Sequence, residues 1–233
     1  MIIEVSALSS LIPRNWIFLG ASSKSYCDRC GACLDLTSGP DPSMKIQQVS
    51  VKNLPRSRVS LSVWVSLNST KGAHDIFITE SSDGSIGYRL QSIDGKVRWS
   101  IGTDNTPIIF DETTKDQVIP EALWTHILVS YNNDNGMIRI FSNGILKLNS
   151  TSRPSSRDWL PYNWDSDASI GDKTFNGYMD EFIMYNWDLD PSEVMYVRNY
   201  CADHPKLVRF TVRVPLTRRR FVPHAQNSNN RSP

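Results

Sequence analysis

The sequence contains no long hydrophobic run, so it predicts no membrane-spanning helix. A span needs about 20 consecutive apolar residues, whereas the apolar stretch near the N-terminus, Trp16–Leu19, has four. Histidine is also scarce: the four histidines accompany no G-x-S-x-G or other nucleophile motif, which argues against nucleophilic hydrolysis. The seven tryptophans, by contrast, exclude a wholly disordered chain, because so much apolar surface is costly to leave in water.

Net charge is nearly absent as well, but the total of +1 combines two unlike parts. Residues 204–233 carry seven Lys or Arg and no acid, so residues 1–203 carry 18 basic against 24 acidic side chains, a net charge of −6. The segment 203–233 turns polar and rich in Pro, Asn and Ser, which predicts a basic, mostly disordered tail. Its Arg218–Arg220 run is short and lacks interleaved aromatic side chains on which bases would stack, so nucleic acid is not predicted as a partner.

The N-terminal segment 1–32 shows no clear pattern. A secretory signal would combine a basic start with about 7–15 apolar residues, but Glu4 lies in the start and Pro13 interrupts the apolar stretch. We therefore predict an irregular segment here, without a convincing signal peptide, in a chain that forms part of a longer protein.

Between the two ends of the chain, alternating apolar residues predict one β-strand after another. Apolar side chains at positions 59, 61, 63, 65 and 67 alternate with Ser or Trp, which is the period of a half-buried strand. The dipeptides Asp94-Gly95 and Asn143-Gly144 each separate two such runs, a strong hairpin signal. Since no helical pattern intervenes, the spacing favours an all-β, two-sheet antiparallel sandwich over βαβ units.

One short helix is predicted near the C-terminal end of this domain. Asp190 is followed directly by Pro191 and, three positions on, by Glu193. This arrangement supplies acceptors for the free N–H groups of a first helical turn. The helix is expected to run to about Tyr200.

Two motifs carry a family resemblance. The first begins at Trp124-Thr125-His126 and ends at Asn143-Gly144; the second, FNGYMDEFIMYN over 175–186, leads into the helix cap. In this order and spacing they resemble the concanavalin A-like laminin G/pentraxin superfamily, over about residues 33–202 and most strongly from residue 120. The resemblance implies a jelly-roll β-sandwich of the kind found in extracellular adhesion proteins and receptor ectodomains.

The resemblance also implies a non-catalytic extracellular recognition or adhesion module, whose rim loops bind a protein or a glycan. Two alternatives stay open: a carbohydrate-active enzyme of glycoside hydrolase type on the same fold, and a purely structural ectodomain spacer. Glycoside hydrolysis needs two carboxylates about 5–10 Å apart across one bond. We find no strand with such a pair, because Asp180 and Glu181 are adjacent and therefore point to opposite faces. We expect no enzymatic activity.

Calcium is the cofactor that the resemblance implies. In relatives, the Asp of the motif G-x-hydrophobic-D-E contributes to a structural calcium site, and Asp180 occupies that position here. Asp172 lies where pentraxins carry an acidic calcium loop. Here Lys173-Thr174 follow it in place of an extended acidic loop, which argues against a paired calcium site. Carboxylate oxygens are ligands that this hard cation prefers.

The four cysteines indicate a disulfide and an oxidising, extracellular setting. Cys27, Cys30 and Cys33 lie far in sequence from Cys201, and without two C-x2-C pairs the set does not resemble a zinc site. We predict a disulfide between Cys201 and Cys33, with Cys27 and Cys30 as the alternative partners. Such bridges persist outside the cytosol.

Two further surface features complete the candidate sites. Asn68 and Asn149 each begin an Asn-Ser-Thr acceptor for N-glycosylation, and both are expected in exposed loops just after strands. Trp159, Tyr162 and Trp164 lie close together in sequence and form a candidate platform on which a sugar ring would stack.

Overall fold

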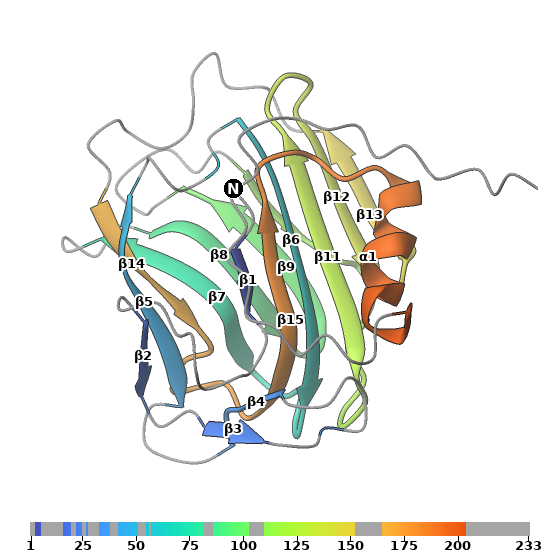
Figure 1. Ribbon diagram of the computed structural model, residues 1–233. Helices are drawn as coiled ribbons and strands as arrows, with labels where there is room; N and C mark the ends of the chain where they lie inside the picture. The colour runs from blue at the N-terminus through green and yellow to red at the C-terminus, as the bar shows by residue number, and fades with distance from the viewer. Residues whose placement is uncertain are drawn as a thin grey trace, which may run out of the picture.

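The computed structural model describes residues 3–5, 16–19, 22–24, 27, 33–37, 42–50, 55, 57–81, 86–102, 110–151 and 165–203. Within these ranges the chain forms two antiparallel sheets packed face to face and one helix (Figure 1). The predicted all-β jelly-roll sandwich with a short C-terminal helix is confirmed.

The described strands divide into sheet 1, in the order β13-β12-β11-β6-β15-β4-β3 with β1 also paired to β15, and sheet 2, in the order β10-β9-β8-β7-β14-β5-β2. The strands of sheet 1 are β1 (Ile3–Val5), β3 (Ser22–Lys24), β4 (Cys33–Asp35), β6 (Arg58–Leu67), β11 (Thr125–Asn132), β12 (Met137–Ser142), β13 (Ile145–Thr151) and β15 (Gly177–Tyr185). The strands of sheet 2 are β2 (Trp16–Leu19), β5 (Ser43–Ser50), β7 (Ala73–Ser81), β8 (Ile86–Ile93), β9 (Lys96–Ile101), β10 (Phe110–Thr113) and β14 (Asp165–Ile170).

The inward faces of the two sheets enclose the main hydrophobic core. On β6 the alternating residues at 59, 61, 63, 65 and 67 are all fully buried. From sheet 2, Tyr88 and Trp99 enter the same core, with their ring centroids 5.9 Å apart in a stacked arrangement. The period-two pattern in the sequence therefore marks the residues that hold the sheets together.

The outward face of β6 is buried as well, so the prediction of a half-buried strand is wrong. The helix α1 (Pro191–Asp203) lies over this side of sheet 1 (Figure 1), where Val194 and Leu189 pack against Phe141. Ser60 on β6 donates its hydroxyl to the carbonyl of Trp187 and accepts the N–H of Leu189, both at 2.9 Å. Ser60 thus binds the connection that leads into the helix.

Both predicted two-residue hairpins form. Asp94-Gly95 joins β8 to β9, Asn143-Gly144 joins β12 to β13, and the φ angles of the four residues lie between 51° and 81°. Two consecutive positive φ angles are what a type I′ turn requires. A third glycine has a different role: a Cβ added to Gly177 would stand 2.1 Å from the carbonyl oxygen of Ser66, so only glycine fits between β15 and β6.

The predicted limits of the sandwich need correction at the N-terminal side. β1, β2 and β3 all precede residue 33, yet they pair with β15, β5 and β4. The segment 1–32 is therefore not wholly irregular; strands of three or four residues are too short to show a clear alternation in the sequence. The predicted tail 203–233 lies outside the described residues beyond Asp203, where α1 ends.

The described part of the chain offers no helix that combines the length and the apolar character of a membrane span. Its one helix has 13 residues.

Candidate functional site

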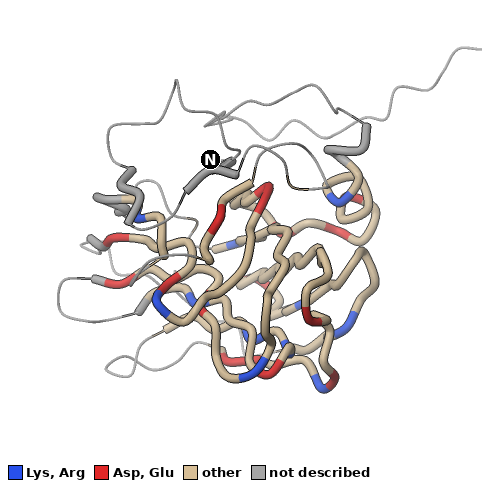
Figure 2. Tube along the Cα trace, turned by 90° about the horizontal axis from the view of Figure 1, so that it is seen from below, with Lys and Arg blue, Asp and Glu red and all other residues tan. Residues whose placement is uncertain are grey.

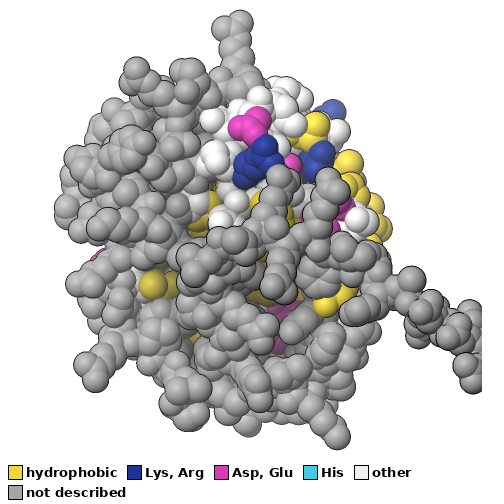
Figure 3. Space-filling view, turned by 45° about the horizontal axis from the view of Figure 1, so that its top comes forward, with side chains coloured by type: hydrophobic (Ala, Val, Ile, Leu, Met, Phe, Trp, Pro, Cys, Tyr) yellow, Lys and Arg dark blue, Asp and Glu magenta, His cyan; other side chains and the backbone are white. Residues whose placement is uncertain are grey.

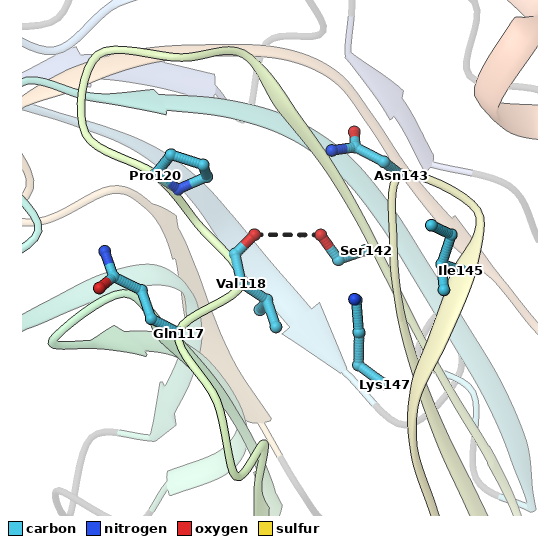
Figure 4. A pocket seen from close by; sticks show the side chains of 7 residues that line it. All are labelled: Gln117, Val118, Pro120, Ser142, Asn143, Ile145 and Lys147. Atoms are coloured by element: carbon cyan, nitrogen blue, oxygen red, sulfur yellow. Dashed lines mark hydrogen bonds between the residues drawn. The ribbon is translucent and has the colours of Figure 1, made fainter.

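An open hollow of about 470 Å³ lies where the loop 114–124, between β10 and β11, meets the β12–β13 hairpin. Figure 4 shows the loop residues on one side of this rim hollow and the hairpin residues on the other. Its lining residues are Gln117, Val118, Pro120, Ser142, Asn143, Ile145 and Lys147. Two segments that are separate in sequence thus form one surface at the rim of the sandwich.

Hydrogen bonds hold the two walls of the rim hollow together. The Ser142 hydroxyl donates to the Val118 carbonyl at 3.1 Å, the dashed line in Figure 4. The Val118 N–H in turn donates to the carbonyl of Gly95 in the β8–β9 turn at 2.8 Å. On the hairpin side, the Asn143 side-chain oxygen accepts the N–H of His126 at 3.0 Å. The surface is therefore formed before any ligand arrives, which lowers the entropy cost of binding.

The rim hollow combines exposed apolar surface with a cation. Ile145, which lines the hollow, is 61% exposed; Leu123 lies outside the lining, in the loop 114–124, and is 60% exposed. Lys147 is exposed and forms no ion pair with any described residue. In Figure 4 its ammonium group points into the space between the two walls. This chemistry suits a ligand that has an apolar face and an acidic group.

Arginines engage two of the carboxylates on sheet 2. Asp75 accepts two hydrogen bonds from the Arg89 guanidinium, at 2.8 and 2.9 Å, and these bonds raise the pKa of Arg89. Asp111 accepts a hydrogen bond from Arg98 at 2.7 Å. Basic and acidic residues interleave over the rest of the described trace too (Figure 2). A carboxylate that an arginine holds is not available to protonate a glycosidic oxygen.

One pair of carboxylate residues lies on neighbouring strands of sheet 2. Glu80 on β7 and Asp167 on β14 are direct cross-strand partners, so their Cβ atoms lie about 4.5–5.5 Å apart. Both side chains are exposed. The general acid of a glycosidase is typically a carboxyl group in a shielded, apolar setting. Glu80 and Asp167 are therefore neighbours across two strands but lack that shielding.

The two predicted calcium ligands both accept hydrogen bonds from their own neighbours. The Asp172 Oδ1 atom accepts the N–H groups of Thr174 and Phe175 at 3.0 and 3.1 Å, which closes the turn before β15. Asp180 is buried, and its Oδ1 accepts the N–H of Glu181 at 2.8 Å at a bulge in β15. Nowhere in the described residues do three His, Cys, Asp or Glu side chains converge as a metal site would require. Calcium binding here stays a prediction.

A serine–histidine contact escaped the sequence reasoning. Ser62 Oγ and His126 Nε2 lie 2.8 Å apart, with the Trp64 ring centroid 5.2 Å from that of the imidazole. Ser62 is 1% exposed and His126 is fully buried, so the pair joins β6 to β11 and no substrate reaches it. Separated by 64 residues, the two side chains carry no local signal of their contact.

The disulfide differs from the predicted one. The structure joins Cys27 to Cys33, so the pairing of Cys201 with Cys33 is wrong, and so is the alternative with Cys27. The physical reason is proximity: a separation of six residues brings the two Cα atoms to 5.9 Å, which is within the range for a bridge. Cys30 and the side chain of Cys201 lie outside the described residues, and a bond between them stays a prediction.

Both predicted glycosylation acceptors are exposed. Asn68 follows β6, and its side-chain nitrogen donates to the Asn176 side-chain oxygen at 2.9 Å. Asn149 lies within β13 and not in a loop, because the strand continues to its sequon threonine; that part of the prediction is wrong. The three residues of the predicted stacking platform lie outside the described residues: Trp159, Tyr162 and Trp164.

Comparison with known families decides where this fold belongs. A laminin G-type profile of the concanavalin A-like lectin/glucanases superfamily matches residues 40–195. The chain belongs to this superfamily. The matched range lies inside the 33–202 segment where the motifs showed the resemblance, so that recognition is confirmed.

The chain spans only part of the length of the receptor and toxin proteins that it matches. It is 27% identical to adhesion G-protein coupled receptor D1 of Bos taurus over 131 residues, which cover 54% of this chain and 14% of the receptor. The fold is similar to the binding domain of Paraclostridial Mosquitocidal Protein 1, with a TM-score of 0.66 and 18% identity over 85% of this chain and 51% of that chain.

The fold is also similar to the receptor binding domain of botulinum neurotoxin D, with a TM-score of 0.61 and 12% identity over 79% of this chain and 47% of that chain. A third similar structure is domain 4 of AbnA, an extracellular arabinanase from Geobacillus stearothermophilus, in complex with arabinotriose. It has a TM-score of 0.58 and 20% identity over 76% of this chain and 81% of that chain. At these identities the likenesses show the fold alone.

Proposed function

We propose that this superfamily member is a non-catalytic recognition domain of an extracellular protein, and that its rim hollow binds a glycan or protein ligand through an acidic group. The observation that carries the proposal is the exposed Lys147 ammonium between two walls that hydrogen bonds hold in place, with exposed Ile145 beside it. A cation next to apolar surface binds an acidic ligand more strongly than either feature alone.

The relatives support a binding role in an ectodomain. The similar structures include a toxin's receptor binding domain and an arabinanase domain with a bound arabinotriose. The receptor relative is an adhesion G-protein coupled receptor, of which this chain matches a small part. The Cys27–Cys33 bridge and the two exposed sequons fit the same oxidising, glycosylating environment.

The binding experiment is an array of glycans and ectodomain proteins, probed with the glycoprotein and with two charge-reversal variants. Lys147→Glu reverses the charge in the rim hollow, whereas Lys71→Glu reverses an exposed lysine that does not line it. We expect Lys147→Glu to lose ligands that carry carboxylate or sulfate groups, and Lys71→Glu to keep them. If both variants bound equally, the rim hollow would not be the binding site.

A carbohydrate-active enzyme is the second candidate, because Glu80 and Asp167 face each other across two strands. Its test is hydrolysis of aryl glycosides and of polysaccharides by the parent chain and by Glu80→Gln. Turnover by the parent that falls at least about 100-fold in Glu80→Gln would replace the recognition proposal, since a general acid or base contributes about 10²–10⁴-fold. Absence of turnover agrees with a binding domain.

Calcium forms an independent part of the proposal. Asp180 is the residue that the superfamily motif points to, and its carboxylate would supply a hard oxygen ligand. A lone carboxylate contributes little affinity, so the other oxygens would have to be backbone carbonyls, amides or water. Isothermal titration with Ca²⁺, in the parent chain and in Asp180→Asn, tests this part separately from ligand binding.

A further inference from the structure

The strand β13 has an exposed, apolar edge. It is the terminal strand of sheet 1, paired with β12, and no described residue pairs with its other side. Of its seven residues, Ile145 is 61% exposed and Leu146 is 45% exposed. In Figure 3, hydrophobic side chains line the right-hand edge of the described surface, the side on which Figure 1 places β12, β13 and α1.

An edge of this kind is a template for another strand. Its unpaired N–H and C=O groups and its apolar side chains favour pairing with an identical edge in a second molecule. Two copies of β13 would form a symmetric contact in which the same residues meet on both sides. Such pairing would bury Ile145 and Leu146, which the single chain leaves in water.

Two features already weaken this edge. Lys147 places a charge in the middle of β13, and the register between β12 and β13 shifts at Ile140 and Phe141. Natural edge strands use charges, and lysine especially, together with bulges, to discourage pairing. The stretch from Leu148 to Thr151 lies beyond both features and keeps a regular register with β12.

Asn149 lies in that regular stretch. It is exposed on β13 and is the acceptor of an Asn-Ser-Thr sequon whose serine and threonine are on the same strand. The following Ser150 donates its hydroxyl to Glu112 of β10 at 2.8 Å, which ties this end of β13 to the neighbouring edge of sheet 2. Consecutive residues of a strand point to opposite faces, so a glycan attached to Asn149 would project from the outer face of sheet 1, beside the free edge of β13.

We propose that an N-glycan on Asn149 shields the free edge of β13 and prevents the domain from pairing through that edge with a second copy of itself. The inference rests on the proposed extracellular setting, because N-glycans are added to proteins that pass through the secretory pathway. A glycan is bulky and hydrophilic, so it blocks the approach of a second strand and leaves the strand's own pairing to β12 intact.

The experiment changes the sequon without changing Asn149. Thr151→Ala removes the acceptor and Thr151→Ser keeps it; both proteins are secreted from mammalian cells, and glycopeptide mass spectrometry measures the occupancy of Asn149. Asn68→Gln removes the other exposed Asn-Ser-Thr sequon of the described residues and serves as the matched control. Sedimentation velocity from 1 to 100 μM, on the order of concentrations where weak pairing appears, gives the mass of each protein.

We expect the parent, Thr151→Ser and Asn68→Gln to sediment as monomers and Thr151→Ala to double in mass. Adding Leu146→Glu to Thr151→Ala should restore the monomer, because it places a charge on the exposed edge. A monomeric Thr151→Ala, or a dimer that Leu146→Glu leaves unchanged, would overturn the proposal. Thermal melts check that each variant is folded.

Glycan occupancy separates this proposal from the proposed function. A glycan on Asn68 with none on Asn149 refutes the shield and leaves the extracellular setting in place. A parent chain without a glycan at either acceptor refutes the shield and counts against the extracellular setting as well.

Discussion

Removing the carboxylate that caps α1 should cost a defined amount of stability. The Asp190 Oδ1 atom accepts the N–H groups of Ser192 and Glu193 at 2.8 and 3.1 Å and the Ser192 hydroxyl at 2.6 Å. In return, the Glu193 carboxylate accepts the N–H of Asp190 at 2.9 Å. Loss of such a cap costs about 1 kcal/mol, within about 0.5–2 kcal/mol. For a domain of this size, Asp190→Ala should lower the melting temperature by about 2–4 °C at pH 7.

The pH dependence of this effect has a definite sign. The hydrogen bond from the Ser192 hydroxyl, followed by that from the Glu193 N–H, lowers the pKa of Asp190 below 3.8. Stabilisation by a carboxyl group with a lowered folded-state pKa is present above its unfolded value and is lost as the pH falls through the folded value. The difference in unfolding free energy between the parent and Asp190→Ala should therefore be constant near neutral pH and shrink below about pH 4.

Denaturant unfolding monitored by circular dichroism, from pH 3 to pH 8 (about the interval that spans carboxyl titration), measures this difference. Asp190→Asn is the matched control, because it keeps an acceptor oxygen and loses the charge; we expect a smaller loss at pH 7 that shrinks below about pH 4 in the same way, since the titrating carboxyl is missing from both variants. Equal stability of the parent and Asp190→Ala at pH 7, or a difference that grows on acidification, would refute the reasoning.

Two further predictions follow from the packing, and a third follows from the calcium proposal. Gly177→Ala should lower the melting temperature strongly in calorimetry, because the new Cβ would stand 2.1 Å from the Ser66 carbonyl oxygen. A melting temperature within about 1 °C of the parent's would contradict the close approach of β15 to β6. Phe141→Ala should cost about 3–5 kcal/mol in chemical unfolding, since Phe141 joins sheet 1 to α1; a loss below about 1 kcal/mol would mean that the helix is not packed there. If Asp180 binds calcium, a chelator should lower the melting temperature of the parent and not that of Asp180→Asn; identical responses would exclude that residue as a ligand.

Much of the fold could be read from the sequence because its signals are local. The two hairpins rest on Asp94-Gly95 and Asn143-Gly144, whose residues accept the positive φ angles of the turns. The helix start rests on Asp190 and Glu193, three residues apart. The motifs between Trp124 and Asn186 then identified the superfamily, because they combine such local signals in a fixed order.

The errors arose where structure depends on partners distant in sequence. The buried outward face of β6 depends on α1, more than 120 residues later, to which Ser60 is tied through Trp187. The bond between Cys27 and Cys33 is an exception, because its partners lie only six residues apart; the short β3–β4 pairing beside them left no pattern in the first 32 residues. The rim hollow escaped prediction because Gln117 and Lys147 meet only once the hairpin and the loop have folded together.

The most direct test of the proposed function is the affinity for the ligand that the array selects, compared between the parent protein and Lys147→Glu. An acidic ligand should bind the parent, and Lys147→Glu should weaken it at least about tenfold, or about 1.4 kcal/mol, because the reversal replaces an attraction with a repulsion. The Lys71→Glu control should leave the affinity unchanged. An affinity that Lys147→Glu does not alter would contradict the placement of the binding site in the rim hollow.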